Sequence, residues 1–174
     1  MDKLNIIIDI IDDKHKLAIQ SHLIEEDIDV KGKKFKVEYP IVKHDVNVEY
    51  LLYRFTENDF PFFKDVTNLK KMCDYILFVQ NKKQLFVFVI DLKSSNYPAQ
   101  KQLNAAKEFV DFLMKSTVRV GVGINEYTVK KIRICDAKVT NKNKFIKVED
   151  KYRFDSNNYL DYQVSKSFHI EPLL

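Results

Sequence analysis

Glycine, proline and cysteine are all scarce in this sequence. Its 174 residues include only 3 glycines and 4 prolines, which argues against a string of small modules and predicts one domain spanning residues 1–174. Hydrophobic residues make up 45% of the chain, enough for a sizeable core. The 2 cysteines, Cys73 and Cys135, have no CxxC neighbour, so we expect buried thiols and no zinc site.

Long hydrophobic runs and a targeting signal are also missing. No apolar run approaches the roughly 20 residues that span a bilayer. The acidic start of the chain, residues 1–13, lacks the basic region and the cleavage site of a signal peptide. We therefore expect no membrane partner and a cytoplasmic location. The net charge of +4 is compatible with a polyanionic partner but does not require one.

The middle of the chain has the clearest secondary-structure pattern. Two apolar runs, 74–79 and 85–90, are separated by a polar turn and are predicted to form a β-hairpin. The second run is apolar on both faces, which is typical of a central strand. An amphipathic helix is predicted over 98–115, and further strands over 118–124 and 127–136. A helix between strands indicates a crossover and some parallel pairing.

The remaining segments have weaker patterns. Residues 4–11 are predicted to form a strand, 28–39 a hairpin, and 45–56 a short helix. An edge strand is expected within 145–154. The tail from Asn157 has little expected structure.

Three charged residues stand at the ends of the two apolar runs. Asp74 opens the first run, and Asp91 and Lys93 close the second. Side chains alternate along a strand, so Asp91 and Lys93 share one face while Leu92 points to the other. In an antiparallel hairpin, the start of the first strand lies beside the end of the second. A suitable register therefore brings Asp74 to Asp91 and Lys93.

This combination of charges indicates metal-dependent chemistry. Two neighbouring carboxylates repel each other unless a cation lies between them. Their oxygens suit Mg²⁺ or Mn²⁺, and the backbone carbonyl of Leu92 offers a further oxygen. Lys93 beside the metal would orient a water molecule and stabilise charge on a phosphate, which indicates phosphodiester hydrolysis. The same Asp–x–Lys spacing also occurs as a simple surface ion pair.

The segments 73–75 (CDY), 91–93 (DLK) and 99–103 (AQKQL) together resemble the PD-(D/E)XK nuclease superfamily. The resemblance implies an α/β (α+β) fold with a restriction-endonuclease-like αβββαβ core, in which a mixed central sheet has flanking helices. We place this core region at residues 45–136. The N-terminal strands in 1–44 and the C-terminal residues 137–174 are then additions to the same domain.

The resemblance also implies roles for individual residues. Asp74 and Asp91 match the metal ligands, Lys93 matches the catalytic lysine, and Gln102 matches a residue close to the site. Asp91 stands where the superfamily commonly has the longer Glu. A third acid often comes from the first core helix.

Two sets of residues are further candidates for the site. For the third acid, the predicted helix at 45–56 offers Glu49, and Glu25 or Glu26 is the alternative. The candidate nucleic-acid contacts are basic residues at the hairpin turn and on one face of strand 127–136: Lys82, Lys83, Lys131 and Arg133. A solvated face is the other interpretation of these four residues.

We therefore expect a Mg²⁺- or Mn²⁺-dependent endonuclease that acts on nucleic acid, with DNA as the first choice, in restriction or phage defence. In such a setting the protein could also form a homodimer or bind an accessory protein. Two other hypotheses stay open. One is a catalytically inactive member of the same fold that acts as a binding or assembly module. The other is an unrelated interaction protein of the immunity type, in which Asp91 and Lys93 form an ion pair. Asp74 on the opposite sheet face from Asp91 would favour this hypothesis.

Overall fold

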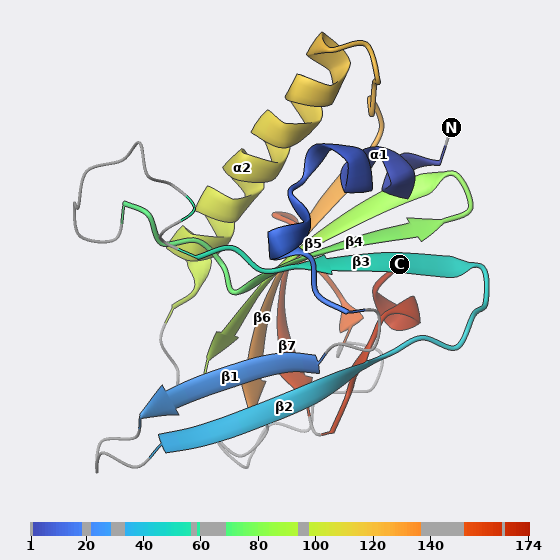
Figure 1. Cartoon of the computed structure of the whole chain (residues 1–174). Coiled ribbons are helices and arrows are strands. Elements are labelled where there is room, and N and C mark those ends of the chain that lie inside the picture. Colours follow the sequence, from blue (N-terminus) through green and yellow to red (C-terminus); the bar gives the residue numbers. More distant parts are fainter. Residues whose placement is uncertain are drawn as a thin grey trace.

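The computed structural model has a mixed α/β fold built on a five-stranded sheet (Figure 1). Two α-helices cover one face of this sheet, and a three-stranded sheet packs on the other. This agrees with the expected fold class. The described residues are 2–18, 22–28, 34–56, 59, 69–93, 98–136, 152–164 and 166–174.

The elements in chain order are α1 (Lys3–Ile10), the 3₁₀-helix η1 (Asp13–His15), β1 (His22–Ile28), β2 (Lys34–Val42), β3 (Val48–Tyr53), β4 (Tyr75–Asn81), β5 (Gln84–Lys93), α2 (Gln100–Arg119), β6 (Thr128–Asp136), β7 (Tyr159–Val164), β8 (Phe168–His169) and the 3₁₀-helix η4 (Glu171–Leu173). The large sheet has the strand order β3-β4-β5-β6-β7. Its first three strands form an antiparallel meander, and β5, β6 and β7 pair in parallel. The order α1, β3, β4, β5, α2, β6 follows the expected αβββαβ pattern, with the β1–β2 hairpin inserted after α1. Its first helix is α1, so this series of elements begins outside the region 45–136 in which the core was expected.

The predicted hairpin in the middle of the chain is confirmed. β4 and β5 pair from Tyr75 opposite Ile90 to Asn81 opposite Gln84. Lys82 in the two-residue turn has a φ of 55°, the left-handed conformation that such tight turns use. This register places the residue before β4 next to the end of β5. The predicted crossover is also confirmed, because α2 connects β5 to the parallel strand β6.

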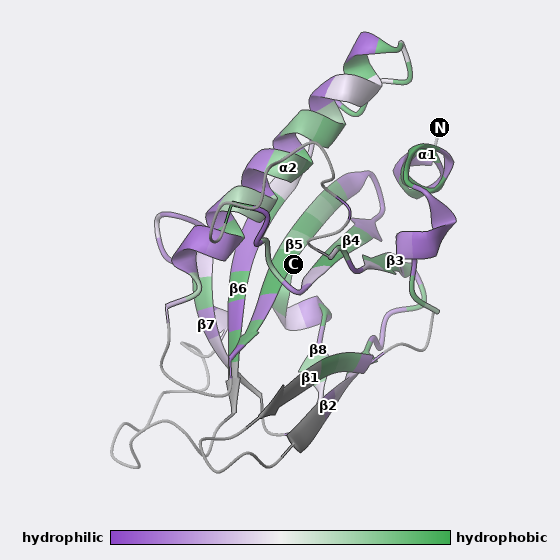
Figure 2. Cartoon of the chain, turned by 60° about the vertical axis from the view of Figure 1, so that its left-hand side comes forward, coloured by the Kyte–Doolittle hydropathy of each residue, from purple (hydrophilic) through white to green (hydrophobic). Residues whose placement is uncertain are grey.

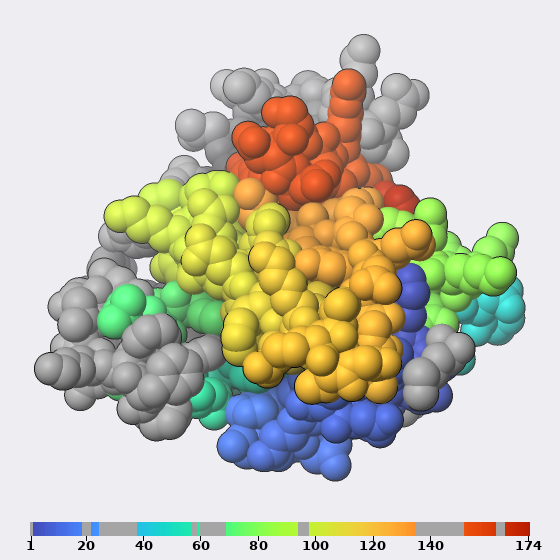
Figure 3. Space-filling model, turned by 90° about the horizontal axis from the view of Figure 1, so that it is seen from above, coloured from blue at the N-terminus to red at the C-terminus, as the bar shows by residue number. Residues whose placement is uncertain are grey.

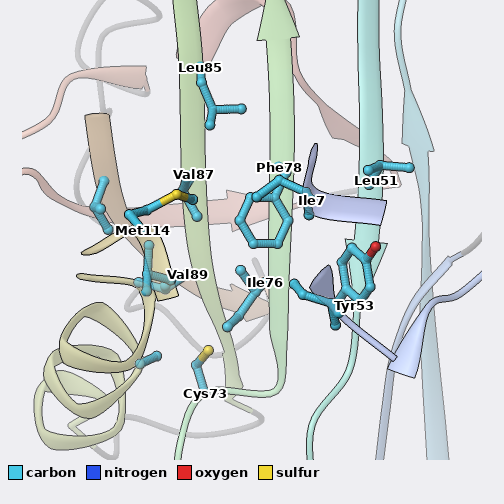
Figure 4. Close-up of a cluster of buried hydrophobic side chains, with 14 of the residues drawn as sticks. Ile7, Leu51, Tyr53, Cys73, Ile76, Phe78, Leu85, Val87, Val89 and Met114 are labelled. Atoms are coloured by element: carbon cyan, nitrogen blue, oxygen red, sulfur yellow. The ribbon is translucent and has the colours of Figure 1, made fainter. Parts of the chain in front are cut away.

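A hydrophobic core fills the space between the large sheet and the two helices. Ile7 of α1 and Leu103 and Val110 of α2 are fully buried there, and each contributes about 1.5–3 kcal/mol of burial free energy. In Figure 2, α2 lies over the side of the large sheet formed by β5 and β6, the two strands on which it packs. The sheet side of this core is drawn in Figure 4 and includes Leu51, Tyr53, Cys73, Ile76, Phe78, Leu85, Val87 and Val89.

A second core lies on the opposite face of the large sheet. Leu77 of β4 and Phe88 of β5 point to this side, where they join Leu23 of β1 and Phe168 of β8. The small sheet, with the order β1-β2-β8, therefore acts as the cover of this face. Both faces of the large sheet are buried, so its central strands are apolar at nearly every position.

This double burial explains why the helix predicted over 45–56 is wrong. The segment contains the strand β3, in which Leu51, Leu52 and Tyr53 are all buried. Leu51 and Tyr53 pack on the helix side and Leu52 on the other. Successive apolar residues on a strand covered on both faces produce a spacing that resembles a helix face.

The strand predicted over 4–11 is also wrong, because α1 forms there. The Asp2 side chain accepts a hydrogen bond from the Leu4 N–H at 3.0 Å and caps the helix N-terminus. Leu4, Ile7 and Ile11 are buried on one side of the segment. Packing of this face on the sheet outweighs the strand preference of the isoleucines.

The strand predicted over 118–124 is replaced by the end of α2 and a turn. The helix continues to Arg119, and Gly121 follows with a φ of 82°. The Val122 N–H donates to the Thr117 carbonyl at 3.0 Å, the bond that defines a Schellman cap. The glycine therefore ends a helix and does not lie in a strand.

The tail from Asn157 is more ordered than expected, because β7 pairs with β6 and β8 pairs with β2. Of the edge strand expected within 145–154, only 152–154 belong to the described residues, and these are not in a strand. Cys73 is a buried free thiol, as predicted. Seen from above, α2 and the segment after it form the middle of the surface, with N-terminal residues along one side (Figure 3). In the described part of the chain, neither helix is long and apolar enough to cross a membrane.

Candidate metal centre

Asp74 and Asp91 face each other at the open end of the β4–β5 hairpin. Tyr75 pairs with Ile90, so Asp74, one residue earlier, lies opposite Asp91, one residue later. The charge of Asp74 acts on the pKa of Asp91, and both residues line one pocket. The two side chains are therefore on the same face of the sheet. The opposite arrangement, expected for an unrelated interaction protein, is not found.

The backbone of β5 holds Asp74 in place. The Leu92 N–H donates a hydrogen bond to Asp74 Oδ2 over 2.7 Å. The N–H and C=O of one strand residue leave from the same edge of the strand. The Leu92 carbonyl, which the sequence indicated as a metal ligand, is therefore on the edge that faces Asp74.

Lys93 lies beside Asp91 on the same strand. Its Nζ is 2.8 Å from Asp91 Oδ2, and the two side chains are 22% and 2% exposed. This contact balances charge, but Asp91 Oδ2 has no well-directed hydrogen bond to any described residue. The buried oxygen thus keeps a lone pair for another ligand.

Burial and mutual repulsion make the two carboxyl groups difficult to ionise together. Burial raises the pKa of Asp91 to about 7, and the charge of Asp74 acts in the same direction, while Lys93 opposes both. Burial also raises the pKa of Asp74, against the Leu92 N–H and the positive charges of Lys93 and Arg54. The pair therefore holds a proton for part of the time near neutral pH. A divalent cation would displace that proton and remove the repulsion.

The donor set fits a small hard cation. Asp74, Asp91 and the Leu92 carbonyl offer only oxygen, which Mg²⁺ and Mn²⁺ prefer. Among the described residues, no cluster of three or more His, Cys, Asp and Glu side chains is arranged to hold a metal. Mg²⁺ commonly uses one or two carboxylates together with water and substrate phosphates. Two carboxylates are therefore sufficient for this type of site.

These groups line a pocket of about 330 Å³. Gln102 reaches it from the first turn of α2, close to the two carboxylates and Lys93. The structure thus brings together the four residues Asp74, Asp91, Lys93 and Gln102. The other charged and hydroxyl-bearing residues of the lining are Arg54, Thr56, Lys70 and Lys71.

The basic residues of this lining were missed from the sequence. Lys70 and Lys71 precede Asp74 by four and three residues, and this short separation is a signal that places them near the site. Arg54 follows directly after β3. The sequence does not place Arg54 near the site, because the segment was predicted as a helix and the pairing of β3 with β4 was not expected.

Glu49 does not join the carboxylate pair. It lies on β3 opposite Gln80, near the far end of β4, and it lines a different pocket together with Lys82. The choice of Glu49 as third metal ligand followed from the incorrect helix at 45–56. The alternatives Glu25 and Glu26 belong to β1, and their side chains lie outside the described part of the structure.

Lys82 and Lys83 are also remote from the pocket. They form the turn between β4 and β5, at the opposite end of the hairpin from Asp74. The seven residues of β4 separate the two ends, a distance of roughly 20 Å at the usual rise of a strand. These lysines do not contribute to the candidate metal centre.

Lys131 and Arg133 are engaged inside the protein. Lys131 is only 8% exposed and donates to Asn104 Oδ1 of α2 over 3.2 Å. Arg133 forms an ion pair with Asp161 on β7, also at 3.2 Å, and its side chain is 12% exposed. Both residues therefore have partners within the fold, and the prediction that they form an open phosphate-binding face is not supported.

Comparisons with protein-family models, with curated proteins and with solved structures gave no match for this chain. A functional assignment therefore depends on the pocket itself and on the chemistry of the groups that line it.

Proposed function

We propose that this protein is a nuclease that uses Mg²⁺ or Mn²⁺ to hydrolyse phosphodiester bonds, and we propose DNA as its substrate. The observation that carries the proposal is the buried carboxylate pair, Asp74 and Asp91, beside Lys93 in one pocket. Paired carboxylates with a raised pKa are expected where a protein prepares a cation site. The setting in restriction or phage defence is proposed from the sequence resemblance alone, and the cytoplasmic location from the sequence patterns at the start of the chain and the lengths of its apolar runs.

Asp74, Asp91 and the Leu92 carbonyl would hold the cation. The hydrogen bond from the Leu92 N–H occupies one Asp74 oxygen and orients the carboxylate. Asp91 offers its Oδ2, which has no well-directed hydrogen bond within the described residues. Binding a divalent cation here would supply a Lewis acid and a more acidic water at neutral pH.

Lys93 and Gln102 would act on the substrate. The Lys93 ammonium lies beside Asp91 and is partly exposed in the pocket, so it can donate to a phosphate oxygen as negative charge develops there. Gln102 carries both a donor and an acceptor. From the start of α2 it can orient a water or a phosphate oxygen next to the carboxylates.

Cleavage assays with metal and without it test this function. Purified protein is incubated with linear and circular DNA in Mg²⁺, in Mn²⁺ or in a chelator. We expect cleavage only with a divalent cation, and its loss in Asp91→Asn and Lys93→Ala. Lys115→Ala is the matched control, since Lys115 is exposed on the same helix as Gln102 but lies near its other end. Circular dichroism checks that each variant is folded.

Full activity of folded Asp91→Asn or Lys93→Ala would contradict the proposed mechanism. Binding of DNA without any cleavage, in both metals, would instead support a binding or assembly module of the same fold. Cleavage of RNA but not DNA would keep the mechanism and change the substrate.

A further inference from the structure

Three basic residues from two separate segments line one side of the candidate metal centre. Arg54 follows β3, and Lys70 and Lys71 precede Asp74. We call these three residues the basic wall. The two segments are separated in the sequence. They come together because β3 and β4 pair antiparallel, which brings the end of β3 next to the start of β4.

Arg54 is held by a series of contacts that reaches the small sheet. Its backbone N–H donates to the His15 carbonyl at 2.9 Å. Its guanidinium carbon lies 5.6 Å from the centre of the Tyr75 ring, within the range of a cation–π contact. The Tyr75 hydroxyl in turn bonds the N–H and the carbonyl of Ile24, at 2.9 and 3.0 Å. Arg54 is thus positioned before any ligand arrives, although its side chain is in an exposed position.

The charge of the pocket favours an anion. Among the described residues of its lining, the basic wall and Lys93 supply four cations and Asp74 and Asp91 two carboxylates, so their formal balance is +2. A divalent cation on the carboxylates would raise this balance further. Lys93 is already committed to Asp91 at 2.8 Å. Arg54 and Lys71 therefore add positive charge to the pocket beyond the Lys93 cation that already contacts the carboxylate pair.

We infer that the basic wall binds the phosphodiester backbone of a nucleic acid strand beside the phosphate presented to Asp74, Asp91 and Lys93. A strand offers phosphates at successive positions, which matches cations spread over two segments better than a single free phosphate does. The inference rests on the proposed function, because it takes the neighbouring phosphate to be hydrolysed at Asp74, Asp91 and Lys93. Binding by the wall can be measured without cleavage.

The test measures DNA binding at several salt concentrations with the metal removed by a chelator. Each phosphate contact contributes about 0.9 to the slope of log K against log salt for duplex DNA and about 0.7 for a single strand. Fluorescence anisotropy with labelled duplex and single-stranded DNA is expected to show a slope reduced by roughly one contact in Arg54→Gln and again in Lys71→Gln. Arg54→Lys keeps the charge and should keep the slope.

The double variant Lys115→Gln/Arg119→Gln is the matched control, because it removes two exposed cations near the C-terminal end of α2, away from Gln102 in its first turn. Its slope should equal that of the unmodified protein. Unchanged slopes in folded Arg54→Gln and Lys71→Gln, or an equal loss in the control, would overturn the inference. If metal-dependent cleavage still required Asp91 in that case, the proposed function would stand without the wall. If the unmodified protein neither bound nor cleaved nucleic acid, the proposed function itself would fail.

Discussion

The backbone N–H of Leu92 donates a hydrogen bond to Asp74 Oδ2 over 2.7 Å. This bond joins the start of one strand to the end of the next and sets the distance between Asp74 and Asp91. Because the donor belongs to the hairpin backbone, the carboxylate pair is as rigid as the sheet. The contacts around this pair lead to the following predictions.

Metal binding should release a proton in a pH-dependent way. Burial and the Asp74 charge raise the pKa of Asp91 to about 7, so the metal-free pair is protonated at pH 6 and ionised at pH 8.5. Titration calorimetry with Mn²⁺ in buffers of different ionisation enthalpy should report release of about one proton at the lower pH and almost none at the higher.

Asp91→Asn is the comparison for this experiment, since it keeps the shape of the side chain and removes the titrating group. We expect its Mn²⁺ affinity to fall at least about tenfold at pH 8.5. Equal proton release at both pH values would show that the pair does not titrate as described.

The metal-free protein should lose stability as the pH rises from about 4 to about 7. Asp91 has a higher pKa in the folded chain than the ordinary 3.8, so in this window the folded state binds more protons than the unfolded state. The free energy of unfolding then falls with rising pH and levels off above pH 7. Urea unfolding in a chelator should show that the drop in Asp91→Asn is smaller by about 4 kcal/mol. A drop of equal size in both proteins would disprove this assignment.

Removal of the Tyr75 hydroxyl should weaken the attachment of the small sheet. Tyr75→Phe takes away both hydrogen bonds to the Ile24 backbone, and we expect a loss of about 1–3 kcal/mol in the free energy of unfolding. Tyr127→Phe is the control, because its hydroxyl donates to the partly exposed Asp111. The control should lose less than about 1 kcal/mol, and an equal loss in both would contradict the structural role of Tyr75.

Gly121→Ala should destabilise the end of α2. Gly121 has a φ of 82°, and an added methyl group would meet no atom within 4 Å, so the loss comes from backbone strain and not from a clash. We expect about 1 kcal/mol in thermal or urea unfolding. Lys115→Ala, at an exposed position of the same helix, should stay within about 0.5 kcal/mol of the unmodified protein.

Local spacing in the sequence predicts the hairpin and, for a suitable register, the meeting of its charged ends. Alternation along a strand places Asp91 and Lys93 on one side, and antiparallel pairing brings Asp74 to them. These relationships depend on residues that are close in the chain. They were therefore visible as local spacing, and the register in the structure, with Tyr75 opposite Ile90, places Asp74 opposite Asp91.

The other residues that reach the pocket are brought there by tertiary packing and could not be identified from local spacing. Glu49 was chosen through a helical spacing that a doubly covered strand produces equally well, and Arg54 was overlooked for the same reason. Lys131 and Arg133 were treated as surface residues until Asn104 and Asp161 were found as their partners. Burial and pairing between distant segments are properties of the assembled sheet. Local periodicity does not show whether one face or both faces of a strand will be covered.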